Sequence, residues 1–213
     1  PQARQVLEAA AVLGRNMDAD LLLATAGQRE LEVVDGVDEL VSRQLLLADG
    51  MNYHFRHELI RLVVYRSLSP WRRRVLHRRA GQSREMRRTG DPAALAHHFE
   101  QAGEPGHAAA HALRAGRAAK ALFAHREARA WFDRALALLE AEAAAQLEPA
   151  ALAAIRRLQI EAFNERGWAL RLLGDMEAYA RDLEQVAHLA HLVDDPLTAA
   201  HLRWRQAHVH RWF

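Results

Sequence analysis

Apolar residues recur every three to four positions along most of this chain, a spacing typical of helices. Prolines at 70, 92, 105 and 196 each follow Ser, Asp or Glu, and proline is well tolerated at the first position of a helix. Glycines or polar turns end most of the segments. The pattern predicts helices at 4–13, 18–26, 30–45, 57–68, 70–89, 92–102, 105–122, 126–140, 151–173 and 176–193, and one more that opens at Pro196.

One segment departs from the helical period. In LLLADGMNYHF, at 45–55, two short apolar runs flank Asp49-Gly50, a dipeptide typical of tight hairpin turns. Three helices, a hairpin and a further helix follow the order of a winged-helix domain, which we place at residues 1–68. The third helix is expected to bury its regularly spaced apolar residues, Leu31, Val34, Leu40 and Val41.

The later part of the chain contains two helix pairs with matched spacing. Small or apolar residues stand at offsets 0, 12, 16 and 19 in both pairs: Gly116, Ala128, Phe132 and Ala135, and then Gly167, Tyr179, Leu183 and Val186. Each glycine is expected to let the second helix of its pair approach closely. The spacing predicts a tetratricopeptide-like α-solenoid over 91–213, with an insertion around 141–157; a generic helical bundle is the alternative. The fold class is therefore mainly α.

Charge is unevenly distributed along the chain. Residues 1–60 carry a net charge of −5, residues 61–90 carry +9, and residues 91–213 carry −2. The middle block contains an Arg-rich linker helix at 69–90. Its basic strip consists of Arg72, Arg73, Arg74, Arg78 and Arg79.

The basic strip has two interpretations. It could bind phosphate or nucleic acid. In the interpretation we favour, some of the arginines of this helix pair with acidic residues of the winged-helix domain, while Trp71, Val75, Leu76 and Met86 face the core. The third predicted helix has five acidic residues, which would repel DNA phosphates, so the sequence argues against direct DNA reading by that helix.

Four segments together resemble a known family. LEAAAVLGRNMDADLLLA, VDELVSRQLLLADG, FRHELIRLVVYRSLSPWRRRVLHRRAG and ALAHHFEQAGEPGHAAAHALRAG are similar to bacterial signalling ATPases of the STAND class, which include large ATP-binding LuxR-type transcriptional regulators. The resemblance runs from about Gln5 to Leu139. It implies an upstream P-loop ATPase domain as a partner, ATP or ADP as the ligand of the intact protein, and repeats that receive a protein or small-molecule inducer. This chain has no Gly-rich phosphate loop of its own, so no cofactor is expected in it.

The resemblance also singles out His57. The segment FRHELIR is similar to the Met-His-Asp motif of related ATPases, with His57 at the histidine and Glu58 at the acid, while Phe55-Arg56 departs from the methionine. It implies that His57 senses the nucleotide phosphate in the intact protein. A plain helix cap is the alternative interpretation.

Other chemistry finds little support. Cysteine is absent, which excludes disulfides and thiolate zinc sites. The histidine pairs 97–98, 107/111, 188/191 and 208/210 lack carboxylates arranged for a metal, and no catalytic constellation is present, so we expect neither a metal site nor an enzyme. No signal peptide or membrane-spanning run occurs, so we expect a cytoplasmic protein.

The ends of the chain indicate an internal fragment. It begins at Pro1 without methionine, and it stops at Trp212-Phe213, which suggests that the repeats are truncated at their C-terminal end. Trp204, Trp212 and Phe213 are expected to pack on a further repeat or to leave an apolar patch that drives self-association.

Overall fold

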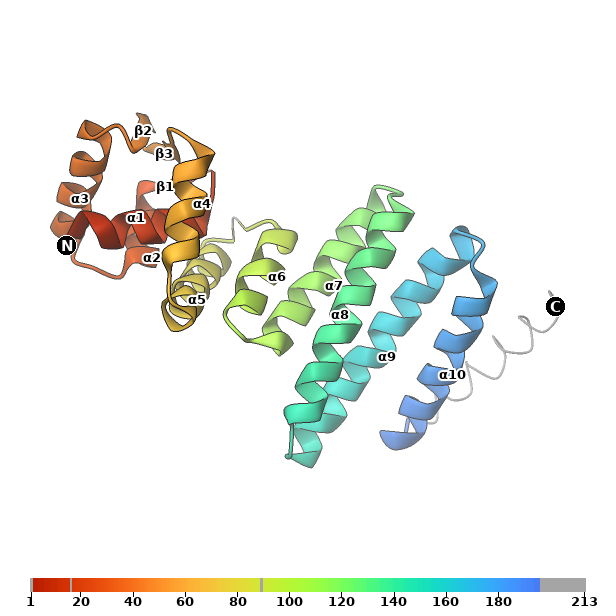
Figure 1. The fold of residues 1–213 in the computed structure, drawn as a ribbon. Coiled ribbons are helices and arrows are strands. Elements are labelled where there is room, and N and C mark those ends of the chain that lie inside the picture. Colours follow the sequence, from red (N-terminus) through yellow and green to blue (C-terminus); the bar gives the residue numbers. More distant parts are fainter. Residues whose placement is uncertain (1, 16, 89, 196–213) are drawn as a thin grey trace. The chain divides into compact units, whose positions relative to one another are not determined.

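The computed structural model describes residues 2–15, 17–88 and 90–195, and the fold is mainly α, as predicted (Figure 1). The chain forms two compact units. One combines the residues up to Gly90 with His97–Glu104, and the other combines Asp91–Ala96 with the residues from Pro105 onward. The helix expected at Pro196 and the expected roles of Trp204, Trp212, Phe213 and the His208/His210 pair lie outside the described residues.

The first unit has a small sheet set among helices. Its elements are α1 (Gln2–Leu13), β1 (Met17–Asp18), α2 (Ala19–Ala26), α3 (Glu30–Ser42), β2 (Leu46–Asp49), β3 (Asn52–Phe55), α4 (Glu58–Ser67) and α5 (Pro70–Met86). The predicted hairpin is confirmed: β2 and β3 pair in antiparallel fashion, with Asp49 opposite Asn52, and Gly50 takes a φ of 59° in the turn. The sequence did not reveal β1, which pairs with β3 to give the strand order β1-β3-β2.

Local signals define the helix ends. Asp18 caps α2, because its Oδ1 accepts a hydrogen bond of 2.7 Å from the backbone N–H of Leu21. Gly27 ends the same helix in the left-handed region, at a φ of 66°. At the start of α5, Ser69 Oγ accepts a hydrogen bond of 3.3 Å from Arg72 N–H, and Pro70 occupies the first turn.

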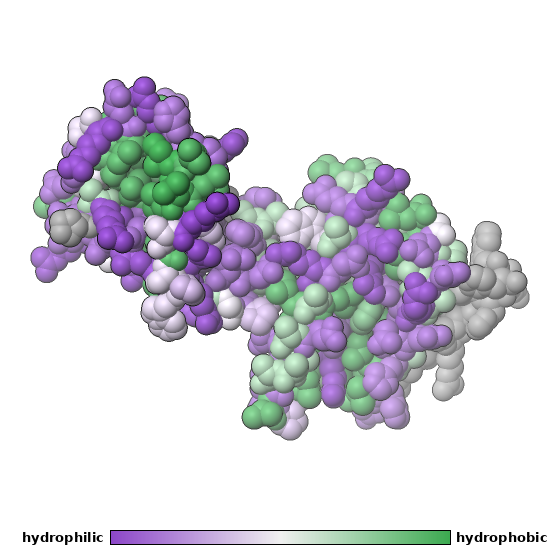
Figure 2. All heavy atoms as spheres, viewed as in Figure 1, coloured by the Kyte–Doolittle hydropathy of each residue, from purple (hydrophilic) through white to green (hydrophobic). Residues whose placement is uncertain are grey.

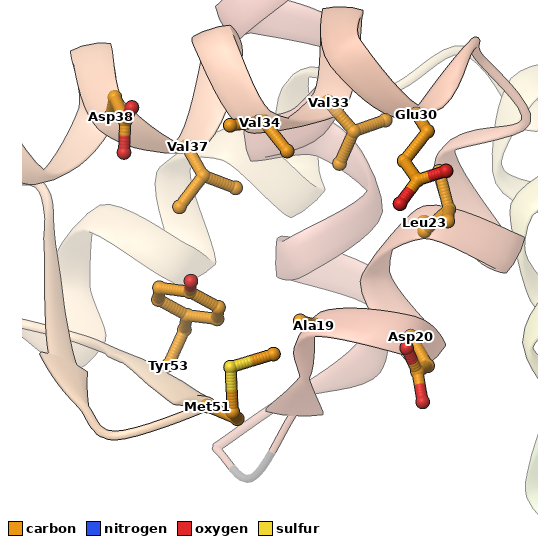
Figure 3. A pocket seen from close by; sticks show the side chains of 10 residues that line it. All are labelled: Ala19, Asp20, Leu23, Glu30, Val33, Val34, Val37, Asp38, Met51 and Tyr53. Carbon is orange, nitrogen blue, oxygen red and sulfur yellow. The ribbon is translucent and has the colours of Figure 1, made fainter.

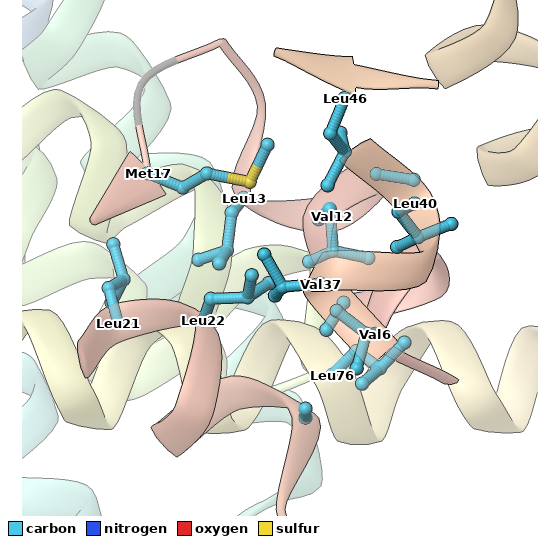
Figure 4. Packing of buried hydrophobic residues seen from close by; sticks show 14 of the residues in the cluster. Val6, Val12, Leu13, Met17, Leu21, Leu22, Val37, Leu40, Leu46 and Leu76 are labelled. Carbon is cyan, nitrogen blue, oxygen red and sulfur yellow. The ribbon is translucent and has the colours of Figure 1, made fainter. Parts of the chain in front are cut away.

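The core of the first unit lies between α1, α2, α3 and α5 and extends to β2 (Figure 4). The residues that meet there include Val6, Leu22, Leu46 and Leu76. Their burial fixes the positions of the hairpin and α5 on the helical part of the unit.

The buried face of α3 differs from the prediction. Leu31 is 77% exposed and Val34 is 48% exposed, whereas the helix buries the stripe Val33, Gly36, Val37 and Leu40. Gly36 explains the difference, because a Cβ there would lie 2.8 Å from Val6 Cγ2 of α1. The close approach of the two helices turns this stripe inward and leaves two apolar residues in solvent.

The second unit is a row of antiparallel helices in which neighbours along the chain pack on each other (Figure 1). These helices are α7 (Pro105–Ala121), α8 (His125–Ala145), α9 (Pro149–Leu172) and α10 (Met176–Leu192), and α6 (Pro92–Gln101) contributes residues to both units. All eight positions of the matched spacing are buried. The helix predicted at 126–140 is longer than expected, because α8 continues to Ala145, and α9 begins at Pro149, two residues before the predicted start at 151. The insertion is thus mostly helical.

Gly116 allows the close packing of α7 on α8. A Cβ at Gly116 would lie 2.4 Å from Cε1 of Phe132, a buried ring. Gly116→Ala is therefore expected to destabilise the second unit by about 1–3 kcal/mol, measured by denaturant unfolding of the whole chain with hydrogen exchange in α7 and α8. Gly106→Ala is the matched control, since its Cβ would meet Glu142 at 3.4 Å and alanine favours the helix. Equal stability of the two variants would contradict the packing argument.

Candidate interaction surfaces

His57 stands at the N-cap of α4 with its side chain exposed. Its backbone is extended, with φ −136° and ψ 130°, and the imidazole makes no capping hydrogen bond. Among the described residues, each arginine of the basic strip contacts a partner other than His57, so the structure does not bring the two predicted sites together. The ring is free to meet a group from outside the described residues.

The residue after His57 is held firmly. Arg61 Nε donates a hydrogen bond of 2.8 Å to Glu58 Oε1, and Arg61 Nη1 donates one of 3.2 Å to the carbonyl oxygen of Ala11 in α1. The hydrogen bond from Arg61 holds the pKa of Glu58 below its usual value. This link fixes the start of α4, and with it the backbone of His57, against the end of α1.

The outer face of α4 is apolar and uncovered by described residues. Leu59 is 70% exposed and Val63 is 60% exposed, and no residue of this helix is fully buried. Figure 2 shows hydrophobic residues gathered on the part of the first unit where Figure 1 places α4. A contiguous apolar face of this kind marks an interaction surface.

The basic strip is occupied by contacts within the first unit. Arg72 pairs with Glu8, Arg78 pairs with Glu104, and backbone carbonyls of Tyr65, Ala102 and Ala26 accept hydrogen bonds from Arg73, Arg74 and Arg79. Further along α5, Arg87 Nη1 donates to Asp18 Oδ1 at 2.7 Å. Burial raises the pKa of Asp18, but the hydrogen bonds from Arg87 and Leu21 outweigh it and leave the pKa below its usual value.

These contacts confirm that arginines of α5 pair with acids from the first residues of the chain. The expectation that Trp71 and Met86 face the core is wrong, because both are exposed. Leu76 is buried as predicted. The long arginine side chains of α5 contact other parts of the first unit, whereas the two large apolar residues at the ends of α5 are exposed to solvent.

A buried polar chain links α4, α5 and α6. Tyr65 Oη lies 3.0 Å from His77 Nε2, and His77 Nδ1 lies 3.0 Å from His98 Nδ1. Burial lowers the pKa of His77 to about 3, assisted by the charges of His97 and Arg73. Burial also lowers the pKa of His98 to about 3, with smaller contributions from His77, Arg84 and His97. Both rings are therefore neutral at pH 7, and the tautomers decide which Nδ1–H donates to the Nδ1 of the other ring.

His77 was not predicted from the sequence. The available signal is its place in α5, where it shares a buried stripe with Leu76, Ala80 and Gly81. Its partner His98 was considered only as one of a histidine pair without metal-binding carboxylates, and its burial was not predicted. Contacts between residues 21 positions apart depend on the packing of α5 on α6.

A second charged network was also missed, in the second unit. Arg166 of α9 donates to Asp182 of α10 through Nε at 2.9 Å and Nη2 at 2.5 Å, and its Nη1 donates to Asp133 of α8 at 2.6 Å. Asp182 is buried, and burial raises its pKa even though the hydrogen bonds from Arg166 oppose the shift. The network joins three successive helices.

Metal binding and membrane insertion receive no structural support. Within the described ranges, no three His, Cys, Asp or Glu side chains are grouped so as to hold a metal ion. None of the helices in those ranges combines the length and apolar character that crossing a bilayer requires.

Comparison with known proteins adds one relative. The chain is similar to an uncharacterized protein of Rhizobium meliloti (strain 1021), with 32% identity over 166 residues. The match covers 72% of this chain but spans only 16% of the relative's length. No protein-family model and no solved structure matches the chain.

Proposed function

We propose that this chain is a regulatory and protein-interaction segment of a bacterial STAND-type ATPase regulator. The first unit would be a winged helix that relays the nucleotide state of an upstream ATPase domain. The second unit would be a tetratricopeptide-like array that binds a partner or inducer. Sequence resemblance suggests the family, and the similarity to a short part of a far longer protein is compatible with a segment of a larger machine.

One observation carries the proposal: α4 presents an exposed histidine at its start and an uncovered apolar face along its length. His57 could reach a phosphate held by a neighbouring domain, because a helix start favours anions. Leu59 and Val63 on the same helix would pack against that domain. The link from Glu58 through Arg61 to Ala11 would carry a displacement of α4 into α1.

Two further features support the architecture. The order of three helices and a hairpin, with β1 pairing onto β3, suits a winged helix. The packing of Gly116 against Phe132 and the burial of all eight matched positions suit tetratricopeptide-like repeats.

The test compares this chain with the natural product of its complete gene. We expect the complete protein to bind a fluorescent ADP analogue and this chain alone not to bind it. In the complete protein, His57→Ala should weaken ADP binding by about tenfold, the loss of one charge-assisted phosphate contact. His54→Ala is the matched control, because His54 is an exposed histidine of β3. A complete protein that does not bind ADP, or equal effects of the two substitutions, would overturn the proposal.

The apolar face of α4 gives a separate prediction. Leu59→Glu with Val63→Glu should change the stability of this chain by less than about 0.5 kcal/mol, because both side chains are already exposed. In the complete protein, ADP binding should change the protection of α4 against hydrogen exchange. The same pair of substitutions should abolish that change. If α4 is protected to the same degree in the complete protein as in this chain alone, no other domain covers this face.

The alternative function, a nucleic-acid-binding module that uses the winged helix and the Arg-rich helix α5, is less well supported. The five arginines of the basic strip already have partners inside the first unit. We expect no retention of this chain on random duplex DNA at physiological salt. Binding that weakens steeply with added salt would favour the alternative.

A further inference from the structure

A pocket of about 160 Å³ lies between α2, α3 and the β2–β3 turn (Figure 3). Val33 and Val37 line it from the buried stripe of α3, and Tyr53 of β3 faces them across the opening. Val34 is 48% exposed and Met51 is 67% exposed, so apolar surface continues out of the pocket. Exposed apolar groups beside a hollow are typical of a binding surface.

The rim of this pocket is acidic. Glu30 and Asp38 belong to the lining and lie eight residues apart on α3, which corresponds to about 12 Å along the helix. Among the described residues, no cation pairs with either carboxylate, whereas the third acid of the lining, Asp20, pairs with Arg87. Two unpaired carboxylates thus flank an apolar floor.

We propose that this pocket binds an amphipathic helix of a partner protein. Apolar side chains one turn apart on the partner would enter between Val34 and Met51. Lysine or arginine side chains two turns apart would reach Glu30 and Asp38, since helices dock in grooves through residues at these intervals. The interface uses α3 and the hairpin, so it does not depend on the proposed role of α4.

Charge complementarity selects this kind of partner over others. Nucleic acid phosphates would be repelled by the same carboxylates, and an acidic helix would meet like charges. The shallow floor offers room for one or two side chains, which suits the apolar stripe of a helix. A basic amphipathic helix offers apolar side chains to the pocket and cationic side chains to Glu30 and Asp38 at its edge.

Methionine methyl NMR provides a site-resolved test with the whole chain. The chain has four methionines, of which Met51 lies in the pocket, Met86 is exposed on α5 and Met176 lies in the second unit. The probe is a synthetic 16-residue helix with leucines along one face and lysines two turns apart. The control peptide has glutamate in place of each lysine. We expect the lysine peptide to shift the Met51 methyl signal saturably, without shifting Met86 or Met176, and the glutamate peptide to leave all of them unchanged.

Matched variants separate the pocket from general attraction to acids. Glu30→Gln with Asp38→Asn should weaken lysine-peptide binding about tenfold, the sum expected for two partly exposed ion pairs. Asp35→Asn removes an exposed acid of the same helix outside the pocket and should leave binding unchanged. Met51→Gln should weaken binding, followed then through the amide signals of the hairpin, whereas Met86→Gln should not.

Several results would overturn the proposal. These are the absence of a saturable Met51 shift, equal weakening by Asp35→Asn, larger shifts at Met86 or Met176, and a Met51 shift caused by duplex DNA. Concentration-dependent self-association that the double acid substitution abolishes would also overturn it, because the occupant would then be a second copy of this chain.

Discussion

Arg166→Met is expected to destabilise the second unit by about 3–5 kcal/mol, because it leaves a buried carboxylate without its partner. Asp182 receives two hydrogen bonds from Arg166 and is buried between α9 and α10. Its pKa is already raised by burial, and the loss of the guanidinium would raise it further. Denaturant unfolding, with hydrogen exchange in α9 and α10, measures the effect.

The network offers its own controls. Asp133→Asn should cost about 1 kcal/mol, since Asp133 is partly exposed and accepts one hydrogen bond from Arg166. Arg166→Met combined with Asp182→Leu should recover more than half of the loss, because an apolar pair can replace a buried ion pair. A double variant as unstable as Arg166→Met alone would show that packing of the arginine stem, and not the stranded charge, dominates.

Mild acid should loosen the first unit through His77 and His98. Both have folded pKa values near 3, below the ordinary value of 6.5, so the unfolded chain binds more protons between those limits. The two neutral histidines make their full contribution to the free energy of unfolding above pH 6.5, and this contribution is lost as the pH falls toward 3. At pH 5.0 the loss is on the order of 2 kcal/mol for the hydrogen-bonded pair taken as one unit, from 1.36 kcal/mol per pH unit.

The groups around the histidine pair fix the direction of the effect. Arg73 and Arg84 of α5 and His97 of α6 face the pair with like charge once it is protonated, and Tyr65 of α4 supplies no carboxylate to offset it. Hydrogen exchange in 70–86 and 97–104 should therefore speed up between pH 7 and pH 5, after correction for the intrinsic rate.

Substitutions identify the source of this acid sensitivity. His77→Gln with His98→Gln should flatten the dependence between pH 7 and 5, whereas His54→Gln, at an exposed histidine, should leave it steep. The paired carboxylates Asp18 and Glu58 have lowered pKa values, so their contributions are lost only at lower pH. An acid response that persists in the double glutamine variant would contradict this assignment.

The parts of the fold that local signals determine could be predicted from the sequence. Asp18, Gly27 and Ser69-Pro70 mark helix ends through their own side chains or backbone, and Asp49-Gly50 marks the hairpin. These signals act over a few residues, so they can be read without tertiary information. The helices and the hairpin were predicted for this reason.

Features that depend on distant contacts were missed. β1 has two residues and exists only by pairing with β3, so it has no period of its own. The inward face of α3 is set by the contact of Gly36 with Val6, which periodicity alone placed differently. The pairing of His77 with His98 likewise requires two helices to meet.

In the candidate surfaces, too, local sequence signals could be predicted and features that depend on distant contacts could not. His57 was found from its motif, but the exposure of Leu59 and Val63 beside it emerged only with the fold. The pocket beside Met51 was not predicted, because Val34, which lines it, was expected in the core and Val33 and Val37 were not singled out. An exposed apolar side chain and a buried one look alike in a sequence.

The short connection between α8 and α9 has a practical consequence. Two long helices meet through Gln146–Glu148, and Leu147 at its centre is 93% exposed. A fluorescent protein or an affinity tag grafted there would be anchored at both ends by helix termini, without entering the hydrophobic interior of either unit. The same site would suit a cleavable spacer for cutting the row of helices in two on demand.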